Sequence, residues 1–141
     1  MTIGARIRKF RNECGLTQRD LADTVGITES AIRNYERDIR TPSDSQIEKI
    51  AVALGVSPDS IRDMGVSGAR GALEVLFRFE RELGLKPVVT YEGIAVVPDS
   101  RKRDTRRTAQ ALELWKCMRD QLEAGEMTEE EYENWKARFQ G

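Results

Sequence analysis

Residues 18–37, QRDLADTVGITESAIRNYER, contain the pattern that most restricts how this chain can fold. Apolar side chains recur there at spacings that close a small core between two consecutive helices. They are Leu21, Val25, Ile27, Ile32 and Tyr35. Ala22 is small where the second helix would cross the first, and Gly26 can take the positive φ of a tight turn. The pattern therefore predicts two short helices that cross at a tight turn.

Polar side chains of this segment fall together on one outward face of the second helix. They are Thr28, Glu29, Ser30, Arg33 and Asn34. A helix that presents such a face, supported by a helix behind it, can enter the major groove of DNA. We therefore interpret residues 18–37 as a DNA-binding helix-turn-helix.

Helix signals continue on both sides of this segment. Ile3, Ile7 and Phe10 are spaced as the apolar face of a preceding helix. N-cap residues are expected at Thr17, Thr28, Ser43 and Ser57. Asp20 and Gln46 stand where a capping box needs them, Gly55 ends a fourth helix, and Pro58 begins a short fifth one. These signals predict five helices up to residue 64.

Residues 3–63 resemble the DNA-binding domain of phage repressors and Cro proteins, the XRE family. The matching strings are IRKFRNECGLTQRDLADTVGITESAIRNYERD and RTPSDSQIEKIAVALGVSPDSI. The resemblance implies a five-helix domain whose third helix reads DNA, in a bacterial regulator of the cytoplasm and nucleoid. It also implies that Gln18 contacts a phosphate or a base edge, and that Arg11 pairs with Glu36. The family usually has glycine where this chain has Asp38, so we expect the same turn with local strain.

The candidate DNA-binding residues are Gln18, Thr28, Glu29, Ser30, Arg33, Asn34, Arg40 and Thr41. Thr28 would cap the recognition helix and reach a phosphate. Glu29 would accept from cytosine N4 or repel a wrong base, while Arg33 and Asn34 could reach guanine or adenine edges. For each of these residues the alternative is a solvated polar face without a ligand.

Charge distribution predicts that one copy binds DNA weakly. The whole chain has a formal charge of -1. Residues 1–40 hold eight basic and six acidic side chains, and residues 1–63 hold ten of each. Phosphate affinity must then come from the placement of charges and from amides at helix N-termini. We therefore expect a homodimer on double-stranded DNA.

Several classes of site are disfavoured by composition. The chain has no histidine, no paired cysteine ligands and no glycine-rich phosphate loop, so we expect neither a metal nor another cofactor and no enzymatic activity. Cys14 and Cys117 are interpreted as small buried side chains in a reducing cytoplasm. No apolar run approaches the length of a membrane span.

The second half of the chain predicts a small α+β domain. Residues 65–70 are interpreted as a linker, and residues 71–141 as a dimerisation or sensor domain. A helix over 72–83 carries two apolar stripes, covered either by its own domain on both sides or partly by a partner subunit. The string KPVVTY-EG-IAVVP predicts a β-hairpin with a two-residue turn at Glu92-Gly93. Such a hairpin must pack on helices or pair with another copy.

A basic loop and two helices complete the predicted domain. The loop over 101–107 is interpreted as solvated, with a second phosphate contact as the alternative; its basic residues are Arg101, Lys102, Arg103, Arg106 and Arg107. Helices are expected over 105–124 and after a Thr128–Glu131 capping box. This tail resembles small C-terminal αα-hairpins of bacterial proteins, and its aromatic residues are expected to be core.

The predicted fold class is mainly α: a five-helix domain over 1–64, then a helix, a β-hairpin and two helices. The leading function is a sequence-specific repressor bound as a homodimer to a two-fold operator. An antitoxin whose C-terminal half binds a toxin is the principal alternative. An interaction module that has lost DNA binding is kept open by Glu29 and the near-neutral charge. A protein partner or a small-molecule effector remains open, without a polar cluster that points to one.

Overall fold

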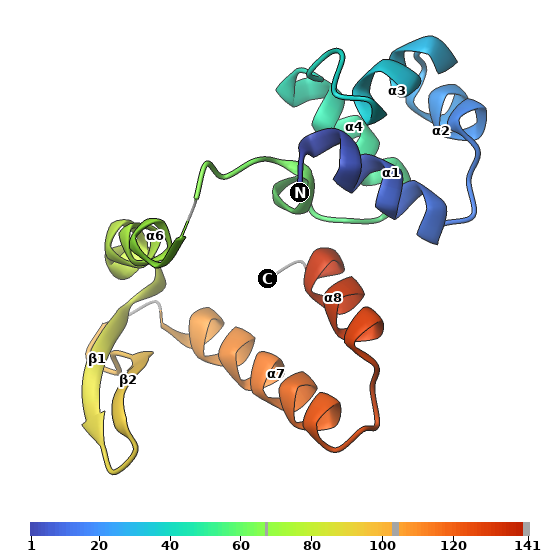
Figure 1. The fold of residues 1–141 in the computed structure, drawn as a ribbon. Helices are drawn as coiled ribbons and strands as arrows, with labels where there is room; N and C mark the ends of the chain where they lie inside the picture. Colours follow the sequence, from blue (N-terminus) through green and yellow to red (C-terminus); the bar gives the residue numbers. More distant parts are fainter. Residues whose placement is uncertain (67, 103–104, 140–141) are drawn as a thin grey trace. The chain divides into compact units, whose positions relative to one another are not determined.

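The computed structural model describes residues 1–66, 68–102 and 105–139. These residues form eight helices and one antiparallel β-hairpin, which confirms the mainly α architecture (Figure 1). The chain divides into two compact units. Of the described residues, the first unit holds Met1–Met64 together with residues 134–139, and the second holds Gly65–Glu133.

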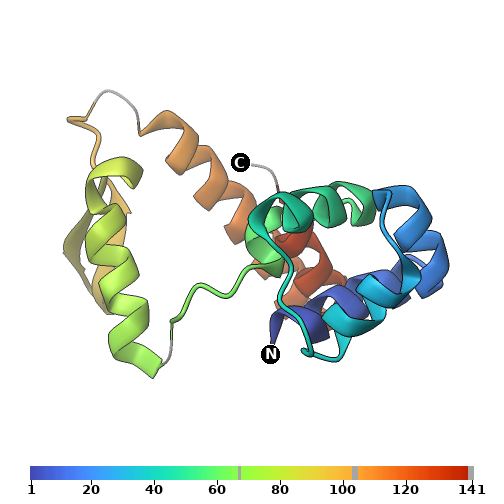
Figure 2. The same ribbon diagram turned by 90° about the horizontal axis from the view of Figure 1, so that it is seen from above.

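Five helices make up the body of the first unit (Figures 1 and 2). They are α1 (Ile3–Glu13), α2 (Gln18–Val25), α3 (Glu29–Glu36), α4 (Asp44–Leu54) and α5 (Pro58–Ile61). The predicted N-caps at Thr17, Thr28, Ser43 and Ser57 are confirmed, because each side chain accepts a backbone N–H of its first turn. Gly26 and Gly55 end α2 and α4 at φ of 75° and 64°, which glycine adopts without steric cost.

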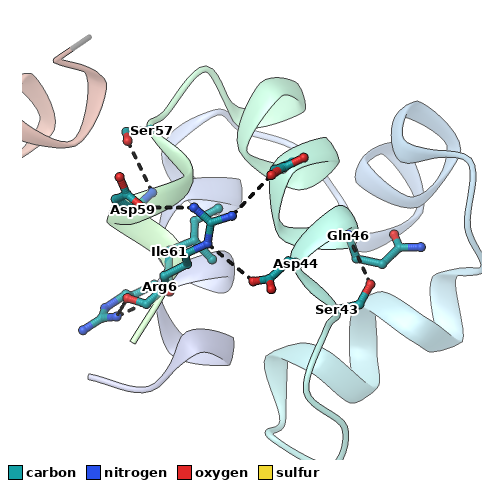
Figure 3. Close-up of polar contacts among 9 residues, drawn as sticks. Arg6, Ser43, Asp44, Gln46, Ser57, Asp59 and Ile61 are labelled. Carbon is teal, nitrogen blue, oxygen red and sulfur yellow. Dashed lines mark hydrogen bonds and ion pairs between the residues drawn. The ribbon is translucent and has the colours of Figure 1, made fainter. Parts of the chain in front are cut away.

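Two of the three predicted capping boxes are complete, and the box of Thr128 and Glu131 is one of them. The side chains of Thr17 and Asp20 each accept a hydrogen bond from the backbone N–H of the other residue. The hydrogen bonds that the Asp20 carboxylate accepts from Thr17 lower the pKa of Asp20. Ser43 Oγ accepts a hydrogen bond from the backbone N–H of Gln46 at 3.4 Å (Figure 3). The side chain of Gln46 does not return the bond, and its Oε1 is buried without a partner. The prediction of a reciprocal box at Ser43 is therefore wrong.

The apolar positions predicted from periodicity form the core of this unit. Its fully buried large side chains are Ile7, Leu21, Ile32, Ile50, Leu54 and Ile61. Ala22 and Ala51 are also buried, so α2 and α4 approach closely. The core thereby fixes α3 against α2, with Ile32 and Tyr35 turned inward.

Polar contacts fasten the end of α5 to α1 and α4. Arg6 of α1 donates to the backbone oxygens of Ile61 and Arg62. The Arg62 guanidinium pairs with Asp59 at 3.0 Å and with Asp44 at 3.6 Å. Both acids are labelled in Figure 3. These contacts place the end of the five-helix segment on α1 and α4.

Asp38 adopts the left-handed conformation expected from its position, with φ of 55°. Its carboxylate accepts from Thr2 Oγ1 at 2.7 Å and from the Gly4 amide at 3.1 Å. A Cβ on Gly4 would lie 2.1 Å from the carbonyl oxygen of Tyr35, so the backbones approach too closely for a side chain there. Asp38 therefore ties α1 to the end of α3, and these bonds offset the strained φ.

The Arg11–Glu36 ion pair implied by the family resemblance is present. Arg11 Nε lies 2.5 Å from Glu36 Oε1, and the two side chains are 10% and 2% exposed. Gln18 also donates to Glu36, at 2.8 Å, and Arg11 donates to the backbone oxygen of Leu16. The bond to Glu36 raises the pKa of Arg11. One buried carboxylate thus joins α1, α2 and α3.

We predict that Glu36→Ala lowers the free energy of unfolding by about 3–5 kcal/mol, because it leaves a buried guanidinium unpaired. Glu29→Ala is the matched control: its partner Arg33 is exposed, so the loss should stay below about 1 kcal/mol. Urea denaturation of both full-length variants measures the difference. Equal losses would contradict a structural role for Glu36.

The second unit contains a helix, a hairpin and most of the C-terminal pair of helices. Its elements are α6 (Gly68–Leu83), β1 (Leu85–Thr90), β2 (Gly93–Pro98), α7 (Arg106–Glu123) and the start of α8 (Glu129–Arg138). Helix α6 begins inside the segment interpreted as a linker, 65–70. Thr90 pairs with Gly93, so the two-residue turn is Tyr91-Glu92. The turn prediction was wrong by one residue, and Gly93, at φ of 132°, begins β2.

Burial in this unit differs from the predictions in three places. Helix α6 has no buried residue, and Phe77 is 65% exposed, so cover on both sides by its own domain is not what the structure shows. Cys117 is exposed rather than buried, whereas Cys14 packs partly against the core. Tyr132 is buried as predicted, but Trp115, which donates to its hydroxyl, is 51% exposed. A helical period gives the apolar face of a helix without saying what covers it.

Asp99 anchors the end of the hairpin. Its buried carboxylate accepts from Lys86 of β1 and from Arg101, both at 3.1 Å. Its amide donates to the Gly84 backbone oxygen at 2.7 Å. The bonds from Arg101 and then Lys86 hold the pKa of Asp99 far below its ordinary value. The charged form of Asp99 is thus favoured in the folded hairpin.

We expect the hairpin of the wild type to persist as pH falls through about 4, where an unfolded aspartate gains its proton. A lowered folded pKa gives stability that is complete above that pH and is lost only as pH approaches the folded pKa. Asp99→Asn should weaken the hairpin at pH 7, and the difference should shrink on acidification. Amide chemical shifts of β1 and β2 during an acid titration test this. A difference independent of pH would refute the charge argument.

Candidate nucleic-acid interface

Helix α3 presents one polar face opposite its buried side. Successive side chains of a helix are about 100° apart, which puts Ser30, Arg33 and Arg37 within about 60° of arc. All three are exposed, whereas Ile32 and Tyr35 are buried on the other side. The exposed face is therefore free to meet a ligand without disturbing the core.

Glu29 and Arg33 are paired along this face. Arg33 Nη2 lies 2.6 Å from Glu29 Oε1, and the side chains are 50% and 43% exposed. The pair is spaced i, i+4, a geometry that stabilises a helix only weakly. Its consequence is local: the one acid on the face is neutralised by a neighbouring arginine. Glu29 thus positions the Arg33 side chain along the helix axis.

Gln18 belongs to the buried network as well as to the predicted interface. Its side-chain amide donates to Glu36, so the free domain holds that group inward. Gln18 is the first residue of α2, and the backbone amides of a helix N-terminus bind phosphate readily. The structure therefore gives the Gln18 side chain a structural partner, Glu36, and its contact with DNA stays a prediction.

The other predicted residues lie around the ends of α3. Thr28 is exposed and caps the helix by accepting from the Ala31 amide at 3.2 Å. Asn34 is half-buried at the edge of the face, and its backbone oxygen accepts from the amides of Ile39 and Arg40. Arg40 and Thr41 are exposed in the following loop. Thr28, Glu29, Ser30 and Arg33 share the face, whereas Asn34, Arg40 and Thr41 border it.

Arg37 is the residue of this face that the sequence interpretation missed. It follows the last residue of α3 as the C-cap and is exposed. Four residues after Arg33, it extends the same helical stripe by one turn. Continuing the period one residue beyond the predicted helix would have found it. Arg33, Arg37 and Arg40 together give the C-terminal end of the interface a positive character.

Among the described residues, the structure offers neither a metal-binding group nor a membrane-spanning helix. No group of three or more His, Cys, Asp or Glu side chains there could hold a metal ion. No described helix is long and apolar enough to cross a membrane. Of the basic loop, Arg101 pairs with Asp99, and Lys102, Arg106 and Arg107 are exposed. Arg103 lies outside the described residues.

Comparison with known proteins matches the N-terminal part of the chain. A helix-turn-helix family model matches residues 7–61. The immunity repressor protein of Bacillus phage phi105 is 41% identical over 61 residues, which are 43% of this chain and 42% of that protein. The transcriptional regulator SinR of Bacillus subtilis is 36% identical over 62 residues, 43% of this chain and 56% of SinR. The chain thus spans about half the length of these two relatives.

A shorter relative is matched along most of its length. The uncharacterized HTH-type transcriptional regulator YazB of Bacillus subtilis is 40% identical over 58 residues, 41% of this chain and 84% of YazB. Among solved structures, SinR in complex with DNA is 35% identical, with a TM-score of 0.43, over 44% of this chain and 100% of that one. On the matches to the family model and to YazB, this chain belongs to the XRE family of helix-turn-helix transcriptional regulators.

Proposed function

We propose that this chain is a sequence-specific transcriptional repressor that acts on the nucleoid in the cytoplasm and binds rather than catalyses. The observation that carries the proposal is the exposed polar face of α3, held outward by the buried side chains Ile32 and Tyr35. The phi105 relative is named as an immunity repressor, which supports repression as the sign of regulation.

The residues of the interface divide into two roles. Ser30 and Arg33 lie at the middle of the exposed stripe and would reach base edges, where arginine reads guanine O6 and N7. Thr28, Arg37 and Arg40 flank the stripe and would contact phosphates, which set the register of the helix. Glu29 would release Arg33 on binding and accept from cytosine N4.

Two copies per site are proposed because a single domain has little net positive charge. A two-fold dimer would place two α3 helices in successive major grooves, about 34 Å apart. The C-terminal half would hold the copies together. Its exposed apolar side chains support this role; the large ones on α6 and the hairpin are Leu73, Leu76, Phe77, Phe79, Leu83, Val89, Tyr91, Ile94 and Val96.

An antitoxin is the second candidate, and the same exposed apolar side chains support it. A toxin protein would then cover them instead of a second copy. Isolation of the chain from its native cell would separate the two functions: a stoichiometric protein partner would favour the antitoxin, and a dimer without other proteins would favour the repressor.

Selection of bound sequences from a random DNA pool, with the full-length protein, tests the leading function. We expect enrichment of an inverted repeat whose half-sites are one helical turn apart. A single enriched half-site would overturn the dimer and keep the DNA-binding role. Folded protein that enriches no sequence would overturn sequence-specific binding.

We predict that Arg33→Ala weakens binding to the selected site by about 1–3 kcal/mol and leaves the melting temperature unchanged. Arg78→Ala is the control, because Arg78 forms an exposed i, i+4 pair with Glu74 on α6, outside the candidate interface. Fluorescence anisotropy at one fixed salt concentration measures both variants on selected and random DNA. Equal losses for the two variants, or equal losses on both DNAs, would exclude base recognition by Arg33.

A further inference from the structure

The last turn of α8 lies against the five-helix segment, in the same compact unit. Residues 134–139 group with Met1–Met64, whereas Gly65–Glu133 form the other unit. Ala137 is 9% exposed and belongs to the same core cluster as Leu54 and Ile61. A residue near the C-terminal end of the chain thus completes the core of the N-terminal domain.

Backbone groups make this contact specific. The carbonyl oxygen of Ala137 accepts from the Ser57 amide at 2.8 Å and from Ser60 Oγ at 3.0 Å. Ser57 is the N-cap of α5, and amides at a helix start lack partners within their own helix. The last carbonyls of a helix such as α8 lack them too. The end of one helix and the start of the other therefore satisfy each other.

Arg138 adds a second contact at the end of α4. Its Nη1 lies 3.5 Å from the Leu54 backbone oxygen and 3.4 Å from that of Gly55. These carbonyls form the negative end of α4, where a cation is favoured. A Cβ added to Gly55 would lie 3.3 Å from Arg138 Nη1, so the guanidinium sits close over the turn. The last turn of α8 thus contacts the α4–α5 junction through the apolar side chain of Ala137 and the charged side chain of Arg138.

We propose that residues 134–139 are the closing turn of the DNA-binding domain, docked by the chain's own α8 at the α4–α5 junction. The chain leaves the domain after Met64 and returns at Asn134, so residues 65–133 are an insertion held at both ends. A partner that binds the insertion and draws α8 away would then loosen α5. The inference does not depend on the proposed operator binding.

Amide hydrogen exchange of the full-length protein tests the docking at one atom, the Ser57 amide. Ala137→Glu puts a charge into a buried position, and we expect Ser57 exchange to rise roughly five- to tenfold, since one hydrogen bond is lost. The amides of Ile50 and Ala51 should stay protected, which shows that α4 remains folded. Ala124→Glu is the control, because Ala124 is exposed at the end of α7. Wild-type exchange at Ser57 in the Ala137→Glu variant would overturn the proposal.

A second variant covers the case in which Ala137→Glu unfolds the domain. Arg138→Glu keeps the buried alanine and places a negative charge beside the carbonyls of α4, so Ser57 exchange should again rise several-fold. If Ala137→Glu unfolds the domain, wild-type exchange of the Ser57 amide in the Arg138→Glu variant would overturn the docking proposal. A dilution series distinguishes the chain's own turn from that of a second copy. Protection independent of protein concentration is expected, and protection lost on dilution would refute docking by the same chain.

Discussion

The carboxylate of Glu36 is the interaction on which the DNA-binding domain depends. It stands at the end of α3 and accepts from Arg11 of α1 and from Gln18 of α2, while Arg11 also donates to Leu16. A buried charge is tolerated only when its neighbours satisfy it, so the three helices are constrained together. The direction of α3 relative to α2 is the geometry that a major groove would meet. The same contact therefore serves the fold and the presentation of the interface.

Around this buried contact, the two sides of α3 meet different requirements. Ile32 and Tyr35 are buried and specify packing, whereas Ser30, Arg33 and Arg37 are exposed and carry no packing duty. The turn after the helix follows the same division. The backbone of Asp38 has a positive φ, and its carboxylate accepts hydrogen bonds from Thr2 and Gly4 at the start of α1. The exposed residues can thus change while the buried frame behind them stays intact.

The second unit relies on shorter-range contacts. Asp99 ties the two ends of the hairpin together through Lys86 and Arg101, but α6 has no buried residue. A two-stranded sheet is marginal in water without a further layer. Exposed apolar side chains on both elements are consistent with a unit that is completed by another protein surface.

Local signals in the sequence were sufficient for the elements of the first unit. Thr17, Thr28 and Ser57 act within three residues, and glycine at residues 26 and 55 ends helices through φ alone, so no distant contact is needed to place them. The prediction fails at Ser43, where Gln46 does not return the capping bond and its Oε1 is buried without a partner. Local signals also do not give the bond from Gln18 to Glu36, because these two residues lie 18 positions apart.

By itself, the sequence determined the five N-terminal helices, their core positions and the polar face of α3, because helical period and capping are local properties. It also determined the hairpin and the last two helices, although the turn was placed one residue late. The tertiary structure alone decided that Asp38 accepts from the Gly4 amide at the start of α1, that Arg37 extends the exposed polar face of α3, and that Ala137 belongs to the buried core of the first unit. Each of these depends on groups brought together from distant positions or on where a helix actually ends, which sequence spacing does not encode.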